Sequence, residues 1–274
     1  MVHGGRPAVL LLGLLIATPL FAQTPSPLAD WQYSAGEVLQ SVSGEPIPEW
    51  RETVGLGVST QPSFVGAKGL KVLPSMVLDL RYKDIAFASD GEGIGVNLLH
   101  GEGYRAGFSL SYDLGRNSHD DDHLRNLPNI SFAPAPKAFA QIFIKPFVLA
   151  VDIRKAIGGN DGLIGELGVY VPIPFDDDDF LLIGPAVTWA DHRYTNAYFG
   201  VSEAASKASG FAPFMAHGGL ANAGAGASFV HLMGDHWLLE GDTGYRRLLG
   251  DSARSPIVET KLQFSLDVNL AYRF

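Results

Sequence analysis

The stretch LQFSLDVNLAYRF, residues 262–274, decides the fold class of this chain. Apolar and polar side chains alternate along it without a break. Because successive side chains of a β-strand point to opposite faces, one face of this strand is apolar and the other is polar. The apolar face carries Leu262, Phe264, Leu266, Val268, Leu270, Tyr272 and Phe274. The segment therefore predicts a long amphipathic β-strand at the C-terminus.

The same alternation recurs through the rest of the chain. Clear examples lie at 54–59, 76–82, 104–115, 147–154 and 237–246. Weaker candidates lie at 85–99, 138–144, 163–171, 180–189, 211–220 and 222–233. Together with the C-terminal segment they predict about twelve strands.

The lengths of the strands and of their connections predict the architecture. Most of the strands run for about nine to thirteen residues, which is longer than usual in soluble sheets and enough to cross a bilayer at a tilt. Connections such as Lys145-Pro146, Ala221-Asn222 and Gly234-Asp235 are short enough for hairpins. No helical crossover pattern separates the strands. The predicted fold class is all-β, an antiparallel up-and-down barrel.

Alternation alone does not say whether water or lipid contacts the outside of such a barrel. The apolar face points inward in a soluble barrel and outward in an outer-membrane barrel. Strand length, aromatic residues at strand ends and a C-terminal Phe274 favour the membrane. We therefore expect a transmembrane barrel with its polar faces in the lumen. The charged residues expected to face the lumen are Arg81, Arg105, Asp113, Asp152, Arg154, Glu240, Asp242, Arg246, Asp267 and Arg273.

The N-terminus has the features of an export signal. Arg6 precedes an apolar run over residues 8–21 that is too short to span a bilayer as a helix. We expect a signal peptide over 1–22, a periplasmic segment over 23–49 and the barrel over 50–274, located in the outer membrane of a Gram-negative cell. The formal charge of −9 speaks against a nucleic-acid partner, and the lack of cysteine excludes disulfides and thiolate metal sites.

Several short motifs are more specific than the alternation. The N-terminal half contains Gly55-Leu56-Gly57 and Gly93-Ile94-Gly95, and the C-terminal half contains Tyr198-Phe199-Gly200-Val201-Ser202, Ser255-Pro256-Ile257-Val258 and Tyr272-Arg273-Phe274. Together these motifs resemble the MipA/OmpV family of outer-membrane proteins, the MltA-interacting proteins. The resemblance covers essentially all of the mature chain. One departure is Phe64, where the family pattern has Tyr.

The resemblance implies an outer-membrane barrel with neither a catalytic residue nor a cofactor. For the best-known member it implies a scaffold between a murein lytic transglycosylase and a bifunctional penicillin-binding protein, with outer-membrane lipid as the other partner. Other members are porin-like or adhesive, so a small porin, an uptake channel or a surface adhesin is the alternative. Charges of both signs in a narrow lumen are compatible with two alternatives. They can pair with one another and close the pore, or they can bind a solute along its path.

The connection over 191–210 carries the candidate partner-contact residues Tyr194, Tyr198 and Phe199. With Phe274 at the periplasmic end and two strands between 211 and 233, this connection is expected in the periplasm, facing murein enzymes. The alternative is a plug in the end of the barrel. The acidic runs at 119–123 and 176–179 lack the ligand spacing of an EF-hand, so solvated loops are expected there and no metal site.

Overall fold

The computed structural model describes residues 48–274. The expected signal peptide over 1–22 and nearly all of the expected periplasmic segment over 23–49 lie outside the described residues.

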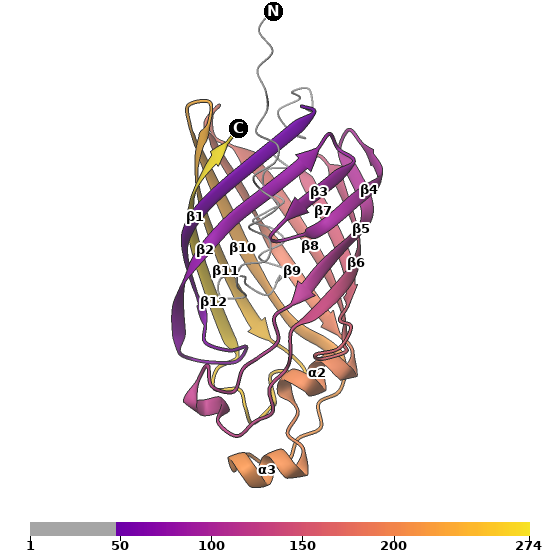
Figure 1. Ribbon diagram of the computed structural model, residues 1–274, viewed down its shortest axis with the longest axis vertical. Helices are drawn as coiled ribbons and strands as arrows, with labels where there is room; N and C mark the ends of the chain where they lie inside the picture. The colour runs from indigo at the N-terminus through magenta and orange to yellow at the C-terminus, as the bar shows by residue number, and fades with distance from the viewer. Residues whose placement is uncertain (1–47) are drawn as a thin grey trace, which may run out of the picture.

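Every strand pairs antiparallel with its neighbours along the chain, and β1 pairs with β12 to close the barrel (Figure 1). The strands are β1 (Trp50–Pro62), β2 (Leu70–Tyr82), β3 (Ala86–Ser89), β4 (Gly93–Gly101), β5 (Tyr104–Asp113), β6 (Ala133–Ile144), β7 (Phe147–Lys155), β8 (Leu163–Pro174), β9 (Asp179–Ala190), β10 (Gly219–Met233), β11 (Trp237–Leu248) and β12 (Leu262–Arg273). The predicted all-β antiparallel barrel of about twelve strands is confirmed.

The helices are short and lie in connections between strands. They are the 3₁₀ helix η1 (Asp122–Leu124), α2 (His192–Phe199) and α3 (Glu203–Ser209). Over residues 48–274, none of the helices combines the length and the apolar character that a membrane crossing requires.

The barrel exposes its apolar side chains and buries its polar ones. On β12, Leu266, Val268 and Leu270 are 40 to 46% exposed, whereas Asp267 is 4% and Asn269 is 6% exposed. This is the reverse of a soluble barrel and matches an outer surface that contacts lipid.

Aromatic side chains gather at the end of the barrel where the chain terminates. Trp50 packs on Tyr82 with ring centroids 4.8 Å apart, and Trp237 packs on Tyr272 at 5.1 Å. Such belts are typical of the membrane interface.

Two of the predicted strand boundaries are wrong. The segment 85–99 forms two strands, β3 and β4, joined by a turn at Asp90-Gly91-Glu92. Gly93 continues this turn with a positive φ of 82°, which glycine adopts without strain. The Asp-Gly pair is a hairpin signal, and it outweighs the apolar residues on either side of it.

The second error concerns β10. Residues 211–220 and 222–233 are not two strands, because a single strand runs from Gly219 to Met233 with a shift in register between Leu220 and Asn222. A β-bulge of this kind breaks the period-two alternation without ending the strand. The expected hairpin at Ala221-Asn222 is therefore absent.

These two errors cancel in the number of strands but not in the sidedness of the loops. With one strand fewer between residue 211 and the C-terminus, the connection 191–218 lies at the end of the barrel opposite Phe274. In Figure 1, α2 and α3 are at the bottom and the C-terminus is at the top. The prediction that this connection lies at the same end of the barrel as Phe274 is wrong.

Connection lengths distinguish the two ends of the barrel. The end that holds Phe274 has short turns at 83–85, 102–103, 145–146, 175–178 and 234–236. The other end has longer connections at 63–69, 114–132, 156–162, 191–218 and 249–261. Outer-membrane barrels place short turns in the periplasm and long loops outside the cell. The long-loop end is therefore expected to face outward.

A protease site inserted after Lys207 in α3 is expected to be cut on intact cells. The same site at Gly234, in the β10–β11 turn, should stay protected until the outer membrane is opened. Both positions are exposed, but they lie at opposite ends of the barrel. Immunoblots of cells treated with external protease measure the two cleavages. Protection at Lys207 together with cleavage at Gly234 would reverse the assignment.

Candidate functional site

The structure places all ten predicted lumen charges away from the lipid-facing surface. Asp152, Arg246 and Arg273 are half-buried. The others are between 2 and 7% exposed, and they are Arg81, Arg105, Asp113, Arg154, Glu240, Asp242 and Asp267. Two further charged side chains that the alternation pattern does not predict, Glu92 and Lys137, are 3% and 4% exposed.

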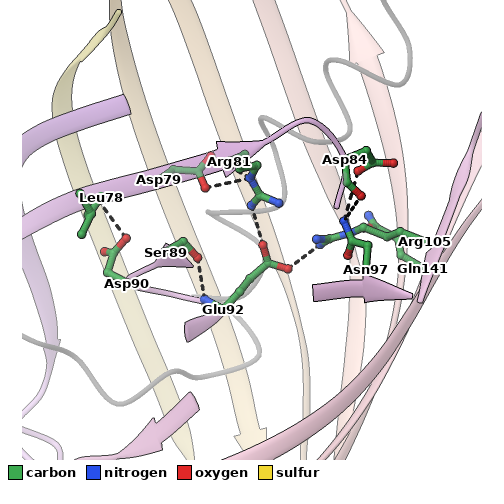
Figure 2. A network of polar contacts seen from close by, with 10 residues as sticks. All are labelled: Leu78, Asp79, Arg81, Asp84, Ser89, Asp90, Glu92, Asn97, Arg105 and Gln141. Atoms are coloured by element: carbon green, nitrogen blue, oxygen red, sulfur yellow. Dashed lines mark hydrogen bonds and ion pairs between the residues drawn. The ribbon is translucent and has the colours of Figure 1, made fainter. Parts of the chain in front are cut away.

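Glu92 joins two strands that are not neighbours in the barrel. Arg81 of β2 donates from Nη2 to Glu92 Oε2 at 2.6 Å, and Arg105 of β5 donates from Nη2 to Oε1 at 2.5 Å. Figure 2 shows the carboxylate between the two guanidinium groups. Arg81 Nε also donates to Asp79 Oδ1 at 2.8 Å, and Arg105 Nε donates to Gln141 Oε1 at 2.7 Å. This arrangement holds the β3–β4 turn against both flanking strands.

The backbone of the same turn is also attached to its neighbours. The N–H of Asp90 donates to the carbonyl oxygen of Leu78 at 3.1 Å, and Tyr112 Oη donates to the carbonyl oxygen of Asp90 at 2.8 Å. On the side of β2 that faces β3, only the segment Asp79–Tyr82 has a strand partner. Within residues 48–274, the rest of β2, toward the long-loop end of the barrel, therefore has no strand partner on that side. Pro74, which has no N–H to leave unbonded, lies on this edge.

Aromatic rings cover the guanidinium groups of this network. Arg81 lies 5.3 Å from the centroid of the Phe87 ring, and Arg105 lies 5.2 Å from the centroid of Phe139. The two rings pack edge to face at 5.7 Å. Cation–π contacts of this kind stabilise buried guanidinium groups and fix their orientation.

Charged side chains gather on two parts of the lumen wall. Lys137 of β6 is paired in register with Arg154 of β7, while Asp242 of β11 is paired with Asp267 of β12. In the closed strand order, β5 and β6 lie across the barrel from β11 and β12. Asp152 and Glu166 adjoin the positive wall, and they are paired in register on β7 and β8. Lys137 and Arg154 therefore lie close to carboxylates of opposite charge, whereas Asp242 and Asp267 lie opposite each other.

The predicted partner-contact aromatics lie at the lumen mouth. Tyr198 and Phe199 are 6% and 2% exposed, and they pack with Ile130 and Leu248. Tyr194 packs on Tyr198 with centroids 4.6 Å apart. Burial raises the pKa of Tyr194, and Asp113 raises it further, while Arg154 and Arg246 act in the opposite direction. In this structure Tyr198 and Phe199 are buried at this end of the barrel, and Tyr194 is half-buried.

Asp113 joins the barrel to the loops above it. Its carboxylate accepts a hydrogen bond from Tyr198 Oη at 2.6 Å and another from Asn160 Nδ2 at 2.7 Å. Burial, together with this carboxylate, raises the pKa of Tyr198 well above its ordinary value, so the phenol stays a donor. Arg116 donates to the carbonyl oxygen of Tyr198 at 2.7 Å. Asp113 therefore positions α2 at the mouth.

Several hydroxyl groups in the lumen have no hydrogen-bond partner among residues 48–274. Ser59, Ser109 and Ser111 are at most 7% exposed, and each Oγ is buried without a hydrogen bond to a described residue. Buried polar groups are normally satisfied by protein, water or ligand.

The acidic loop runs show no metal geometry. Within residues 48–274, no group of three acidic, histidine or cysteine side chains is placed to hold a metal ion. Asp176 accepts backbone N–H groups of its own turn, and Asp121 accepts from Ser63 Oγ at 2.5 Å. The Ser63 hydroxyl holds the pKa of Asp121 below its ordinary value.

A curated protein and several solved structures are similar to this chain. It is 26% identical over 134 residues to an Escherichia coli (strain K12) protein described as "Putative outer membrane protein YiaT", covering 46% of this chain and 51% of that protein. The chain thus spans about half the length of that relative. Among solved structures, an outer membrane channel from Pseudomonas putida F1 has a TM-score of 0.47 at 12% identity, covering 84% of this chain and 97% of the other. The CymD monoaromatic hydrocarbon channel has a TM-score of 0.43 at 12% identity, covering 94% and 98%.

The match to a protein family is more extensive. The family model described as MltA-interacting protein MipA matches residues 54–274, which is every strand of the barrel except the first few residues of β1. The chain therefore belongs to the MipA family of outer-membrane β-barrel proteins.

Proposed function

We propose that the chain is an outer-membrane channel for small charged solutes. The observation that carries the proposal is the charged lining of the lumen, with Lys137 and Arg154 on β6 and β7 and with Asp242 and Asp267 on β11 and β12. Charged side chains on the wall of a lumen orient dipolar solutes and raise the local concentration of ions. Unbonded serine hydroxyls supply further polar contacts along the path.

Conductance in planar bilayers tests this proposal. The purified mature chain is expected to give small, defined current steps, because α2 covers one end of the lumen. Lys137→Gln should shift the reversal potential in a salt gradient toward cation selectivity, since it removes one positive charge from the lumen wall. Lys207→Gln removes the same charge from exposed α3 and should leave the reversal potential unchanged. No current, from either the intact chain or one with the 191–218 connection shortened, would refute a channel.

A second candidate function is a scaffold for murein enzymes. The observation that favours it is the family match, because the family is described by an interaction with MltA. A murein lytic transglycosylase and a bifunctional penicillin-binding protein are the proposed partners. The described residues offer them only short turns at the end that holds Phe274, so contact would also involve residues 23–49. Affinity capture from solubilised envelopes should recover both enzymes with the full mature chain and lose them when 23–47 are deleted.

A further inference from the structure

We propose that a cavity at the long-loop end of the barrel is a binding site for the carboxylate group of a small organic acid, with Arg254 as its main contact. The cavity lies where α2, the start of β10 and the 249–261 connection meet. The site goes beyond the proposed channel function, because none of the charged residues of the lumen lines it.

The cavity has the size of a small-molecule site. Its volume is about 310 Å³, and ligand pockets in proteins start at about 300 Å³. At the volume that one water molecule takes up, about 30 Å³, this is room for about ten non-hydrogen atoms. The residues that line it include Thr195, His217, Gly218, Asp251, Ser252 and Arg254.

The walls of the cavity are held in place by contacts between backbones. A Cβ at Gly218 would lie 2.8 Å from the backbone nitrogen of His192, so only glycine fits against the start of α2 at this position. On the other side, the N–H of Leu249 donates to the carbonyl oxygen of Ala221 at 2.9 Å. The cavity is therefore formed without a ligand.

Asp251 positions two basic side chains at the cavity. Its Oδ1 pairs with Nη2 of Arg254, and its Oδ2 accepts the backbone N–H of His217 at 2.8 Å and lies 2.9 Å from His217 Nδ1. The hydrogen bond from Arg254, followed by those from His217, holds the pKa of Asp251 below its ordinary value. Asp251 therefore stays ionised with both of its oxygens in use, and it acts as a positioning residue.

Arg254 keeps donors for a ligand. A guanidinium group has five N–H donors, and the contact with Asp251 is made through Nη2. The Arg254 side chain is 71% exposed, so a ligand that enters from the solvent can reach it. Ser252 lines the same cavity and is 1% exposed, and its Oγ has no hydrogen-bond partner among residues 48–274.

These groups suit a carboxylate better than a cation. Among the lining residues, all of them within the described chain, Asp251 is the only acidic one, and Arg254 already offsets its charge. The planar guanidinium group matches the two oxygens of a carboxylate, and hydrogen bonds between charged partners are the stronger kind. A singly charged carboxylate therefore gains the most here.

Calorimetric titration of the full mature chain in detergent with sodium propionate tests the site. Saturable binding of one propionate per chain is expected. Arg254→Gln should weaken it about tenfold or more, because the charge-assisted hydrogen bonds are lost. Propionamide has nearly the same shape as propionate but no charge, and it should give no measurable binding.

Arg125→Gln is the matched control. Arg125 is 70% exposed and pairs with an aspartate three residues before it, as Arg254 does, but it does not line the cavity. Its substitution should leave the affinity for propionate unchanged. Heat-modifiable migration on gels confirms that each variant is folded.

Three results would each overturn the site. They are the absence of saturable propionate binding, equal loss of affinity in Arg254→Gln and Arg125→Gln or in neither, and binding of propionamide as tight as that of propionate. The titration needs no membrane and no current, so a barrel that binds propionate without conducting refutes only the channel.

Discussion

Glu92→Gln is expected to lower the free energy of unfolding of the barrel by about 3 kcal/mol or more. The neutral side chain would leave the Arg81 and Arg105 guanidinium groups facing each other without the carboxylate that joins them. All three side chains are at most 8% exposed, so solvent screens them weakly. The loss matters more here because β3 contributes only four register pairs with β2. Urea unfolding in lipid bilayers, followed by tryptophan fluorescence, measures the change.

Glu102→Gln is the matched control for this prediction. Glu102 is an exposed glutamate in the β4–β5 turn, and its substitution should change the unfolding free energy by less than about 0.5 kcal/mol. Equal stability of the two variants would show that the Glu92 network does not hold the wall together. A second check is Arg81→Gln combined with Glu92→Gln, which should recover part of the lost stability because one of the facing cations is removed.

The strands that could be predicted are those whose two faces differ without interruption. β12 and β5 are of this kind, since lipid selects one face and the polar lumen selects the other. The prediction failed at β10, where the bulge near Leu220 shifts the alternation, and at β3–β4, where the turn is short enough for apolar residues to continue past it. The period-two alternation shows which residues share a face of a strand, but it does not locate turns and bulges.

The alternation pattern fails to predict Glu92 and Lys137 as lumen residues for related reasons. Glu92 lies in a turn, where period-two alternation assigns no face, although Asp90-Gly91 marks the hairpin that positions it. Lys137 lies in β6 after Pro134 and Pro136, both of which are exposed within the strand. Proline argues against a strand in a sequence pattern, so the predicted strand began too late to include Lys137.

Replacing the 191–218 connection with an Asn-Gly turn is expected to convert small current steps into a steady, several-fold larger conductance. Ala190 and Gly219, which flank the connection, are paired in register across β9 and β10, so a two-residue hairpin can join them. The replacement removes Tyr194, Tyr198 and Phe199 from the lumen mouth. Planar bilayer recordings measure the change.

Removal of α3 alone tests whether α2 is the part that covers the lumen. In Figure 1, α3 lies farther from the strands than α2, and deleting Glu203–Ser209 leaves the three aromatic residues in place. The current of that variant should match the intact chain. If the long deletion also leaves the current unchanged, the obstruction is not in this connection. If the α3 deletion alone opens the pore, the packing of Val201 and Ala205 against Leu124 and Ile257 governs closure. Either result would show that α2 is not the gate. The aromatic residues of α2 can act as the gate only if deleting them raises the current and deleting α3 alone does not.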